Sequence, residues 1–400
     1  MQSRNNIYSS ENRFAWLEIS LESLSDNFNL INDYIANLEN ADNAKPKIMA
    51  VVKANAYGHG LIEISRKALL SGASWLGVAL VQEGLKLREG GIKAPVLCLG
   101  SHAPQKIKDA VENDITLSIT SIESAKLISD FCIKAGLETS VHVKIDTGMN
   151  RIGINHKNAI QSILLIKKMP KIKIDGVFTH FACASEKEES YTLMQWERFS
   201  KIVKELKEMD LGISNYHCAN SAAFVRYPHM HLDMVRLGII IYGISPFDSD
   251  FYEYCSQDAV EFIKRLKPVL SFKAKISFIK RTSAGESISY HGTFKTDRES
   301  IIATIPVGYA DGYARRFSNK SRMIFDGCFA PVIGNVTMDQ TMIDLTDCNE
   351  AKKAKSGDEV VIIGKINGLE LTATELAELI GTINYEIICM IGDRIPRIYL

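Results

Sequence analysis

Eight short apolar runs, separated by stretches that can form helices, restrict the fold of this chain more than any other feature of its sequence. Continuous apolar runs that alternate with helical segments are typical of parallel strands buried on both faces of a sheet. Eight such units within roughly 200 residues favour a (β/α)8 barrel of the TIM type, although a doubly wound open sheet also fits the alternation. The runs lie at residues 48–52, 75–80, 95–99, 116–119, 141–145, 176–181, 216–219 and 234–238.

The apolar pattern changes near residue 250. From Leu270 to Phe278 every second residue is apolar, which predicts a half-buried antiparallel strand. The chain has 400 residues, whereas a single core stops growing near ~250–300 residues. We therefore expect an α/β protein with a barrel over residues 1–250 and a second, mainly β domain over residues 251–400. Further short strands are expected at residues 301–307, 322–325, 330–334, 342–345 and 359–363.

The charge balance argues against two classes of partner. Lysine plus arginine equals aspartate plus glutamate at 47 residues each, so the chain lacks the basic excess that nucleic acids and anionic membranes attract. No apolar run reaches the roughly 18–20 residues of a membrane span, and the polar N-terminal segment lacks the apolar core of a secretion signal. We therefore expect a cytoplasmic protein with neither a nucleic-acid nor a membrane partner.

The eight cysteines are scattered along the chain and include no C-x-x-C pair. The sequence therefore indicates neither a zinc site nor a small disulfide framework. His229 and His231 are close together but have no third candidate ligand near them, so we expect no metal. In a cytosolic chain of this size, free and buried thiols are the expected state of the cysteines.

Polar residues gather where the predicted barrel strands end. In this fold, catalytic groups collect at the C-terminal ends of the strands, and phosphate groups often bind after strands seven and eight. Ser221 and the backbone N–H groups of Gly238 and Ile239 are placed for such a phosphate. Each candidate alone is better explained as a solvated side chain at a strand end, so their joint pattern indicates the site. The other members of that pattern are Lys53, Lys144, Arg151, His180, Asn220 and Arg236.

Seven motifs, in order and spread over essentially the whole chain, resemble those of the alanine racemase family. This resemblance implies a pyridoxal-phosphate enzyme that interconverts L-alanine and D-alanine, a peptidoglycan precursor. Leu237 and Thr337 depart from the family, which usually has proline and often has cysteine there, but neither change removes a functional group. The motifs are AVVKANAYGHG (50–60), DTGMNRIG (146–153), THFACASE (179–186), HCANSAA (217–223), SISYHGTF (287–294), PVGYADGY (306–313) and GNVTMDQTMID (334–344).

The resemblance also assigns roles to the residues that would bind the cofactor. Lys53 is similar to the lysine that forms a Schiff base with pyridoxal phosphate and then serves as one base. Arg236 resembles the partner of the pyridine nitrogen. Arginine does not release its proton to the pyridine nitrogen, so that nitrogen stays unprotonated. An unprotonated pyridine ring withdraws electrons weakly, which favours racemisation over transamination. The remaining cofactor-binding residues that the family implies are Tyr57, Arg151, His180, Asn220, Ser221, Gly238, Ile239 and Tyr385.

Tyr290 resembles the second base, which family members take from the partner subunit, so the resemblance implies a homodimer with shared sites. Two bulky partner residues over the pocket leave room for little beyond a methyl side chain, which favours alanine as the substrate. Lys144 stands where many members carry a carbamylated lysine that pairs with an arginine, here Arg151. The implied substrate-binding residues are Arg151, Tyr309, Met338 and Asp339.

Three alternatives stay open at this point. The chain could racemise serine or a broader range of small amino acids. A pyridoxal-phosphate decarboxylase shares the barrel-plus-β plan, but it generally has an acidic partner at the pyridine nitrogen, where this chain has Arg236. A non-catalytic carrier of the cofactor is typically a single short barrel, which the second domain and Tyr290 argue against.

Overall fold

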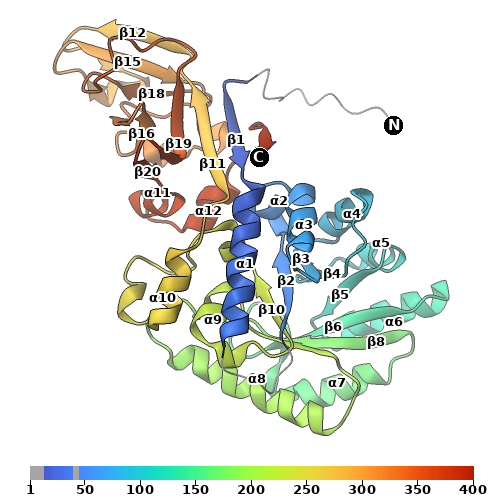
Figure 1. Ribbon diagram of the computed structural model, residues 1–400. Coiled ribbons are helices and arrows are strands. Elements are labelled where there is room, and N and C mark those ends of the chain that lie inside the picture. Colours follow the sequence, from blue (N-terminus) through green and yellow to red (C-terminus); the bar gives the residue numbers. More distant parts are fainter. Residues whose placement is uncertain (1–12, 39–44) are drawn as a thin grey trace. The chain divides into compact units, whose positions relative to one another are not determined.

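The computed structural model describes residues 13–38 and 45–400, and the chain divides into two compact units (Figure 1). We call them the barrel unit and the β unit. The barrel unit comprises Ser23–Ala56 and Leu61–Lys267. Of the described residues, the β unit comprises residues 13–22, Tyr57–Gly60 and Pro268–Leu400.

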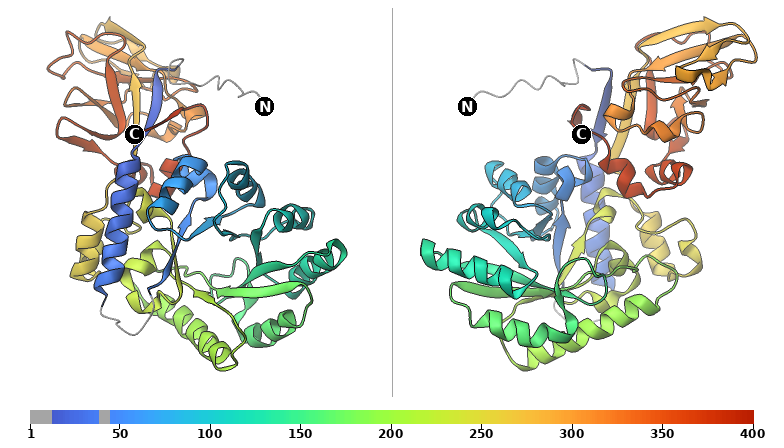
Figure 2. Two further views of the ribbon diagram at one scale, coloured as in Figure 1. Left: turned by 45° about the vertical axis from the view of Figure 1, so that its right-hand side comes forward. Right: turned by 180° about the vertical axis from the view of Figure 1, so that it is seen from behind.

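The barrel unit contains eight parallel strands in the order β10-β2-β3-β4-β5-β6-β8-β9. Backbone hydrogen bonds from Arg236 N to Ala219 O (3.0 Å) and from Asp233 N to Tyr216 O (3.1 Å) connect the two ends of this order and close the ring. Every residue of β3, β4, β5, β9 and β10 is buried, as expected for strands covered on both faces. Helices surround the strands (Figures 1 and 2), and the predicted (β/α)8 barrel is confirmed.

The elements of the barrel follow the predicted runs closely. Its strands are β2 (Lys47–Val51), β3 (Trp75–Val78), β4 (Val96–Cys98), β5 (Ile115–Ile119), β6 (Thr139–Asp146), β8 (Ile172–Phe178), β9 (Asn215–His217) and β10 (Met234–Leu237), and the short β7 (Ile154–Asn155) pairs with β6. Its helices are α1 (Leu21–Asn37), α2 (Lys53–Tyr57), α3 (Leu61–Leu70), α4 (Val81–Glu89), α5 (Ile107–Glu112), α6 (Ile122–Ala135), α7 (Ala159–Lys167), α8 (Ser190–Glu208), α9 (Ser221–Arg226) and α10 (Gln257–Lys264).

The β unit is built on a mixed sheet with the order β17-β16-β19-β11-β1-β21, in which β20 pairs with β19. Two smaller sheets, β12-β15-β18 and β13-β14, complete it, and the mainly β character of the second domain is confirmed. The elements are β1 (Ala15–Ile19), β11 (Leu270–Lys275), β12 (Phe278–Thr282), β13 (Ser287–Ile288), β14 (Phe294–Lys295), β15 (Ser300–Ile305), β16 (Arg322–Phe325), β17 (Cys328–Pro331), β18 (Thr341–Asp344), β19 (Glu359–Ile366), β20 (Leu369–Leu371), β21 (Arg397–Tyr399), α11 (Ala373–Ile380) and α12 (Asn384–Cys389).

The division of the chain differs from the predicted boundary at residue 250 in three places, one of which is the segment Tyr57–Gly60 of the β unit. Residues 251–267 lie in the barrel unit, because α10 buries Phe262 against Tyr34 of α1, with ring centroids 4.9 Å apart. Strand β1 lies in the β unit, because it pairs with β11 on one side and β21 on the other. The sequence of this five-residue strand does not indicate which strands it pairs with.

One predicted strand is split in two. The alternation from Leu270 to Phe278 continues through β11 and into β12, but these strands belong to different sheets. The chain changes sheets where Ile276 N donates to Asp358 O (2.9 Å) and Ser277 N donates to Thr304 O (2.9 Å). Alternation indicates which face of a strand is buried, but it does not indicate which neighbouring strand it pairs with.

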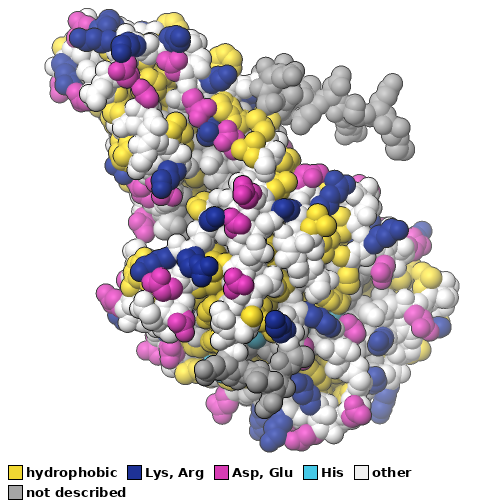
Figure 3. All heavy atoms as spheres, viewed as in Figure 1, with side chains coloured by type: hydrophobic (Ala, Val, Ile, Leu, Met, Phe, Trp, Pro, Cys, Tyr) yellow, Lys and Arg dark blue, Asp and Glu magenta, His cyan; other side chains and the backbone are white. Residues whose placement is uncertain are grey.

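The expectation that all cysteines are free is wrong for one pair. Cys328 and Cys348 form a disulfide between β17 and the turn after β18, and residues 20 apart in sequence carry no local motif that would reveal it. The other six cysteines are free, and three of them, Cys98, Cys132 and Cys218, are buried. In the described part of the chain, no helix is long and apolar enough to cross a membrane. On the face shown in Figure 3, acidic and basic side chains are interspersed.

Candidate active site

Lys53 stands two residues after β2 and begins a strained turn. The next four residues, Ala54 to Tyr57, all have left-handed backbone, with φ between 53° and 54°. For residues with a Cβ this conformation costs roughly 1–2 kcal/mol each, and such strain concentrates at functional sites. The side chain of Asn55 accepts a hydrogen bond from Leu61 N (2.9 Å), which fixes the exit from the turn.

Glu83 secures this turn from the neighbouring βα unit, and it was not identified from the sequence. Its Oε1 accepts from Ala54 N (2.6 Å), while its Oε2 accepts from Ala79 N (2.8 Å) and Leu80 N (3.1 Å) at the end of β3. One carboxylate therefore joins the loops that follow two adjacent strands. Its position in the first turn of α4 was the available signal, since acids there commonly cap free N–H groups.

Replacing Ala54 with glycine should raise the free energy of unfolding by about 1 kcal/mol, because glycine adopts positive φ without the clash of a Cβ. Urea unfolding monitored by circular dichroism measures the change. The matched control is Ala36→Gly, at an exposed position of the right-handed helix α1, where glycine should cost roughly 0.5–1 kcal/mol. Equal destabilisation by both substitutions would contradict the strain assigned to the turn.

Four basic side chains of the barrel unit lie near enough for their charges to interact: Lys53, Lys144, Arg151 and Arg236. Burial, the largest cause, and the charges of Arg151, Arg236 and Lys53 together lower the pKa of Lys144 to about 7. The same charges and burial hold the pKa of His180 well below its ordinary value, so its ring is neutral. The structure thus brings these five predicted residues together. A cluster of cations of this kind fits an anionic ligand.

Asp146 shapes the turn that leads to Arg151. Its Oδ1 accepts from Gly148 N (2.9 Å) and Asn150 N (3.1 Å), and its charge opposes the fall in the pKa of Lys144. Arg151 itself is exposed to solvent. Among the described residues, no group of three or more His, Cys, Asp or Glu side chains is arranged to hold a metal ion.

Arg236 is buried in β10, with 4% of its surface exposed. Its Nη1 donates to Nδ1 of His217 (2.9 Å), and its Nη2 donates to the carbonyl oxygens of Thr179 (2.8 Å) and Cys218 (3.0 Å) and lies 3.2 Å from Nδ1 of His180. Burial lowers the pKa of Arg236 to about 10, so it remains a cation at neutral pH. His217 belongs to the motif HCANSAA, but the sequence did not predict its contact with Arg236.

The residues predicted to hold a phosphate also meet. The hydroxyl of Ser221, at the start of α9, accepts from Gly238 N (3.0 Å), and Ile239 begins the next helical turn. The side chain of Asn220 caps α9 by accepting from Ala223 N (3.0 Å). A hydroxyl beside backbone N–H groups at two helix starts is a donor set suited to phosphate oxygens.

Tyr57 and Tyr385 both belong to the β unit, with ring centroids 6.2 Å apart. Burial raises the pKa of both phenols well above the ordinary value, which keeps them as neutral hydrogen-bond donors. Gly58 and Gly60 let the following turn approach its neighbours: a Cβ on Gly60 would lie 1.9 Å from the hydroxyl of Tyr399.

Among the large side chains of the β unit that face solvent are three of the predicted site residues: Tyr290 (71% exposed), Tyr309 (44%) and Met338 (53%). Tyr290 lies in a turn between Ser289 and His291, whose φ angles are 64° and 66°. Asn335 fastens that turn, because its Nδ2 donates to Tyr290 O (2.7 Å) and its own carbonyl accepts from the Ser289 hydroxyl (2.7 Å). The ring of Tyr290 is therefore held outward by a turn whose backbone is fixed.

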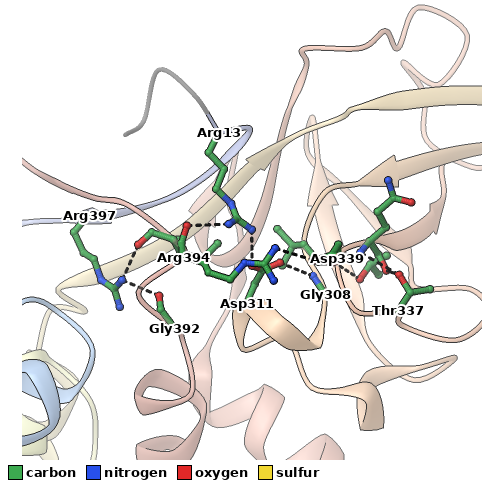
Figure 4. A network of polar contacts seen from close by, with 12 residues as sticks. Arg13, Gly308, Asp311, Thr337, Asp339, Gly392, Arg394 and Arg397 are labelled. Carbon is green, nitrogen blue, oxygen red and sulfur yellow. Dashed lines mark hydrogen bonds and ion pairs between the residues drawn. The ribbon is translucent and has the colours of Figure 1, made fainter. Parts of the chain in front are cut away.

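A network of arginines and carboxylates fixes the segments that carry Tyr309 and Met338 (Figure 4). The two segments are joined by hydrogen bonds from Tyr309 N to Thr337 O (3.0 Å) and from Ala310 N to Met338 O (3.0 Å). Arg394 binds Asp339 (2.7 Å), and Arg13 forms an ion pair with the fully buried Asp311. The predicted residues Tyr309, Met338 and Asp339 thus share one rigid frame, whose arginines the sequence did not reveal.

Comparison with known proteins places this arrangement in a family. Residues 19–246 match the model of the alanine racemase N-terminal domain, and residues 269–399 match that of the C-terminal domain. The alanine racemase of Clostridium novyi (strain NT) is 41% identical over 389 residues, which cover 97% of this chain and 96% of that protein. The alanine racemase of Methanococcus maripaludis is 38% identical over 96% of this chain and 98% of its own length.

Solved structures give the same result. Alanine racemase of Clostridium difficile 630 superposes with a TM-score of 0.87 at 36% identity, covering 97% of this chain and 96% of that one. The Bacillus anthracis alanine racemase with bound L-Ala-P gives a TM-score of 0.86 at 37% identity over 97% and 95% of the two chains. This chain therefore belongs to the alanine racemase family and is a pyridoxal-phosphate-dependent racemase.

Proposed function

We propose that this racemase, whose reaction interconverts L-alanine and D-alanine, works with Lys53 and the Tyr290 of a partner subunit as its two bases. The observation that favours racemisation is the setting of Arg236, whose partners are imidazoles and backbone carbonyls rather than a carboxylate. That setting suits racemisation, and nothing in the comparisons favours the decarboxylase or the carrier.

The residues of the barrel unit fit pyridoxal phosphate. We assign the phosphate to Ser221, Gly238 and Ile239, and the pyridine nitrogen to Arg236, while Lys53 binds through its amine. From the family resemblance we also assign cofactor contacts to Tyr57, His180, Asn220 and Tyr385. When bound, the cofactor supplies the electron sink that makes the α-proton of an amino acid removable.

Inversion requires proton transfer on both faces of the α-carbon. Lys53 serves one face, and Tyr290, carried by the partner, serves the other. The high exposure of Tyr290 and the rigid frame of Tyr309 and Met338 support a homodimer, because those side chains are available to a second chain. Tyr309 and Met338 limit the substrate side chain, and Asp339 stands beside them. The family resemblance adds a cytoplasmic location and a role in supplying D-alanine for peptidoglycan.

We assign carbamylation to Lys144. With a pKa of about 7, much of this amine is neutral at physiological pH, and the neutral amine is the form that reacts with carbon dioxide. The carbamate would turn a cation into an anion that pairs with Arg151. Arg151, oriented in this way, would bind the substrate carboxylate.

Borohydride reduction of the enzyme with its cofactor, followed by peptide mapping, should place the pyridoxyl group on Lys53. The Lys53→Arg variant is the control and should carry no label. Its racemisation of alanine should fall by at least roughly 10³-fold, since arginine cannot act as a base. A label on another lysine of the wild-type chain would contradict the assignment of Lys53. Faster turnover of serine than of alanine would contradict alanine as the preferred substrate.

A further inference from the structure

A line of buried polar groups runs from Arg236 through the interior of the barrel. Nη1 of Arg236 lies 2.9 Å from Nδ1 of His217, and Nε2 of His217 lies 2.9 Å from Nδ1 of His142. Nε2 of His142 lies 3.8 Å from Oδ2 of Asp175, a charge contact that is longer than a hydrogen bond. The four residues come from β10, β9, β6 and β8. Neither histidine has any exposed surface.

The direction of the hydrogens along this line follows from the chemistry of its first member. A guanidinium only donates, and a neutral imidazole has one donor and one acceptor nitrogen. Burial lowers the pKa of His217 and of His142, so both rings are neutral. Nδ1 of His217 must therefore accept, and its hydrogen is on Nε2. Nδ1 of His142 accepts that hydrogen, which leaves its own hydrogen on Nε2, facing Asp175.

The fold makes specific room for His142. A Cβ on Gly176 would lie 2.6 Å from Nδ1 and Cε1 of the His142 ring, so any side chain there would displace it. The register of β6 against β8 shifts between Val141 and His142, beside that glycine. On the other ring, Phe178 stacks over His217 with centroids 4.8 Å apart and planes 2° from parallel.

The far end of the line is anchored by polar groups. Asp175 Oδ2 accepts from Nδ2 of Asn215 (2.8 Å), and Oδ1 of Asn215 accepts from Nζ of Lys47 (2.7 Å). The neighbouring ring of His142 is the largest cause that lowers the pKa of Asp175, which therefore remains a carboxylate. The carboxylate of Asp175 thus ends this line of polar groups and does not itself contact Arg236.

We propose that His142, oriented by Asp175, is a positioning residue that holds the guanidinium of Arg236 by fixing the tautomer of His217. If the hydrogen of His217 moved to Nδ1, it would face an N–H of Arg236 and push the guanidinium away. With the tautomer fixed, Nη1 keeps a second hydrogen for the cofactor nitrogen. This role rests on the proposed function of Arg236.

Neutron diffraction of the wild-type protein tests the tautomers directly and does not depend on catalysis. Deuterium should be found on Nε2 of both His142 and His217. Deuterium on Nδ1 of either ring would overturn the proposal. This measurement decides the matter even if a variant at position 142 fails to fold, and it stands apart from whether the enzyme racemises alanine.

Two variants test the consequence for turnover. In His142→Phe, the hydrogen on His217 loses its acceptor, and kcat for alanine should fall about tenfold with KM within about twofold. His142→Asn offers an amide oxygen in place of Nδ1 and should recover kcat to within about twofold of wild type. Equal losses in both variants, or no loss in His142→Phe, would refute the positioning role. Inactivity of the wild type on alanine would instead refute the proposed function.

Discussion

Mixing Lys53→Ala subunits with Tyr290→Phe subunits should restore racemase activity that neither variant shows alone. Each substitution removes one base, and loss of a positioned acid or base typically costs 10²–10⁴-fold in rate. In a hybrid dimer with shared sites, one site has both damaged residues and the other has neither. Random exchange makes about half of the dimers hybrids, so about a quarter of wild-type activity should return.

The structural reason lies in where the two bases are held. Lys53 begins the strained turn that Glu83 fastens in the barrel unit. Tyr290 belongs to the β unit, is 71% exposed, and lies on a turn fastened by Asn335. A two-fold dimer with shared sites would build two complete sites at once.

The hybrids are verified by mass spectrometry of isotopically labelled subunits. The control mixes Lys53→Ala with Lys53→Gln, in which every site lacks the lysine, so no activity should return. Tyr290→Phe keeps the aromatic ring and removes only the hydroxyl, so the surface that the ring presents is preserved. Absence of rescue in verified hybrids would mean that Tyr290 serves its own subunit.

Most of the fold was predictable, because burial on both faces leaves a clear mark on a parallel strand. The eight apolar runs became the eight barrel strands, each within a few residues. Pairing between segments that are far apart in the chain produces no comparable pattern in the sequence. The placement of β1 beside β11, the change of sheet after Lys275 and the disulfide Cys328–Cys348 all depend on partners far along the chain.

The candidate site divides in the same way. The cluster of Lys53, Lys144 and Arg236 was predictable, since the ends of parallel barrel strands meet at one face. The residues that position this cluster could not be predicted from the sequence. Glu83 and His142 sit in ordinary helix and strand patterns, and only their hydrogen bonds reveal what they fix.

Arg236→Glu should reduce racemisation by at least about 100-fold and should release more pyruvate from alanine by transamination than the wild type does. A glutamic acid at this position would have no arginine charge beside it and would lie among the acceptors that Arg236 now satisfies, Thr179 O and Cys218 O. Burial among acceptors favours its protonated form. That proton is available to the cofactor nitrogen, which strengthens the electron sink and gives the deprotonated α-carbon time to react elsewhere.

The matched control is Arg236→Gln, which has the same length and can donate to the carbonyls but cannot supply an acidic proton. It should lose racemisation to a similar extent without releasing more pyruvate. D-alanine is measured by chiral chromatography and pyruvate by a coupled dehydrogenase assay, with thermal midpoints recorded for both variants. The ratio of pyruvate to D-alanine is the decisive quantity, because a general loss of packing lowers both products together. A ratio that is unchanged from wild type in Arg236→Glu, or raised equally in both variants, would show that the donor at position 236 does not direct the fate of the α-carbon.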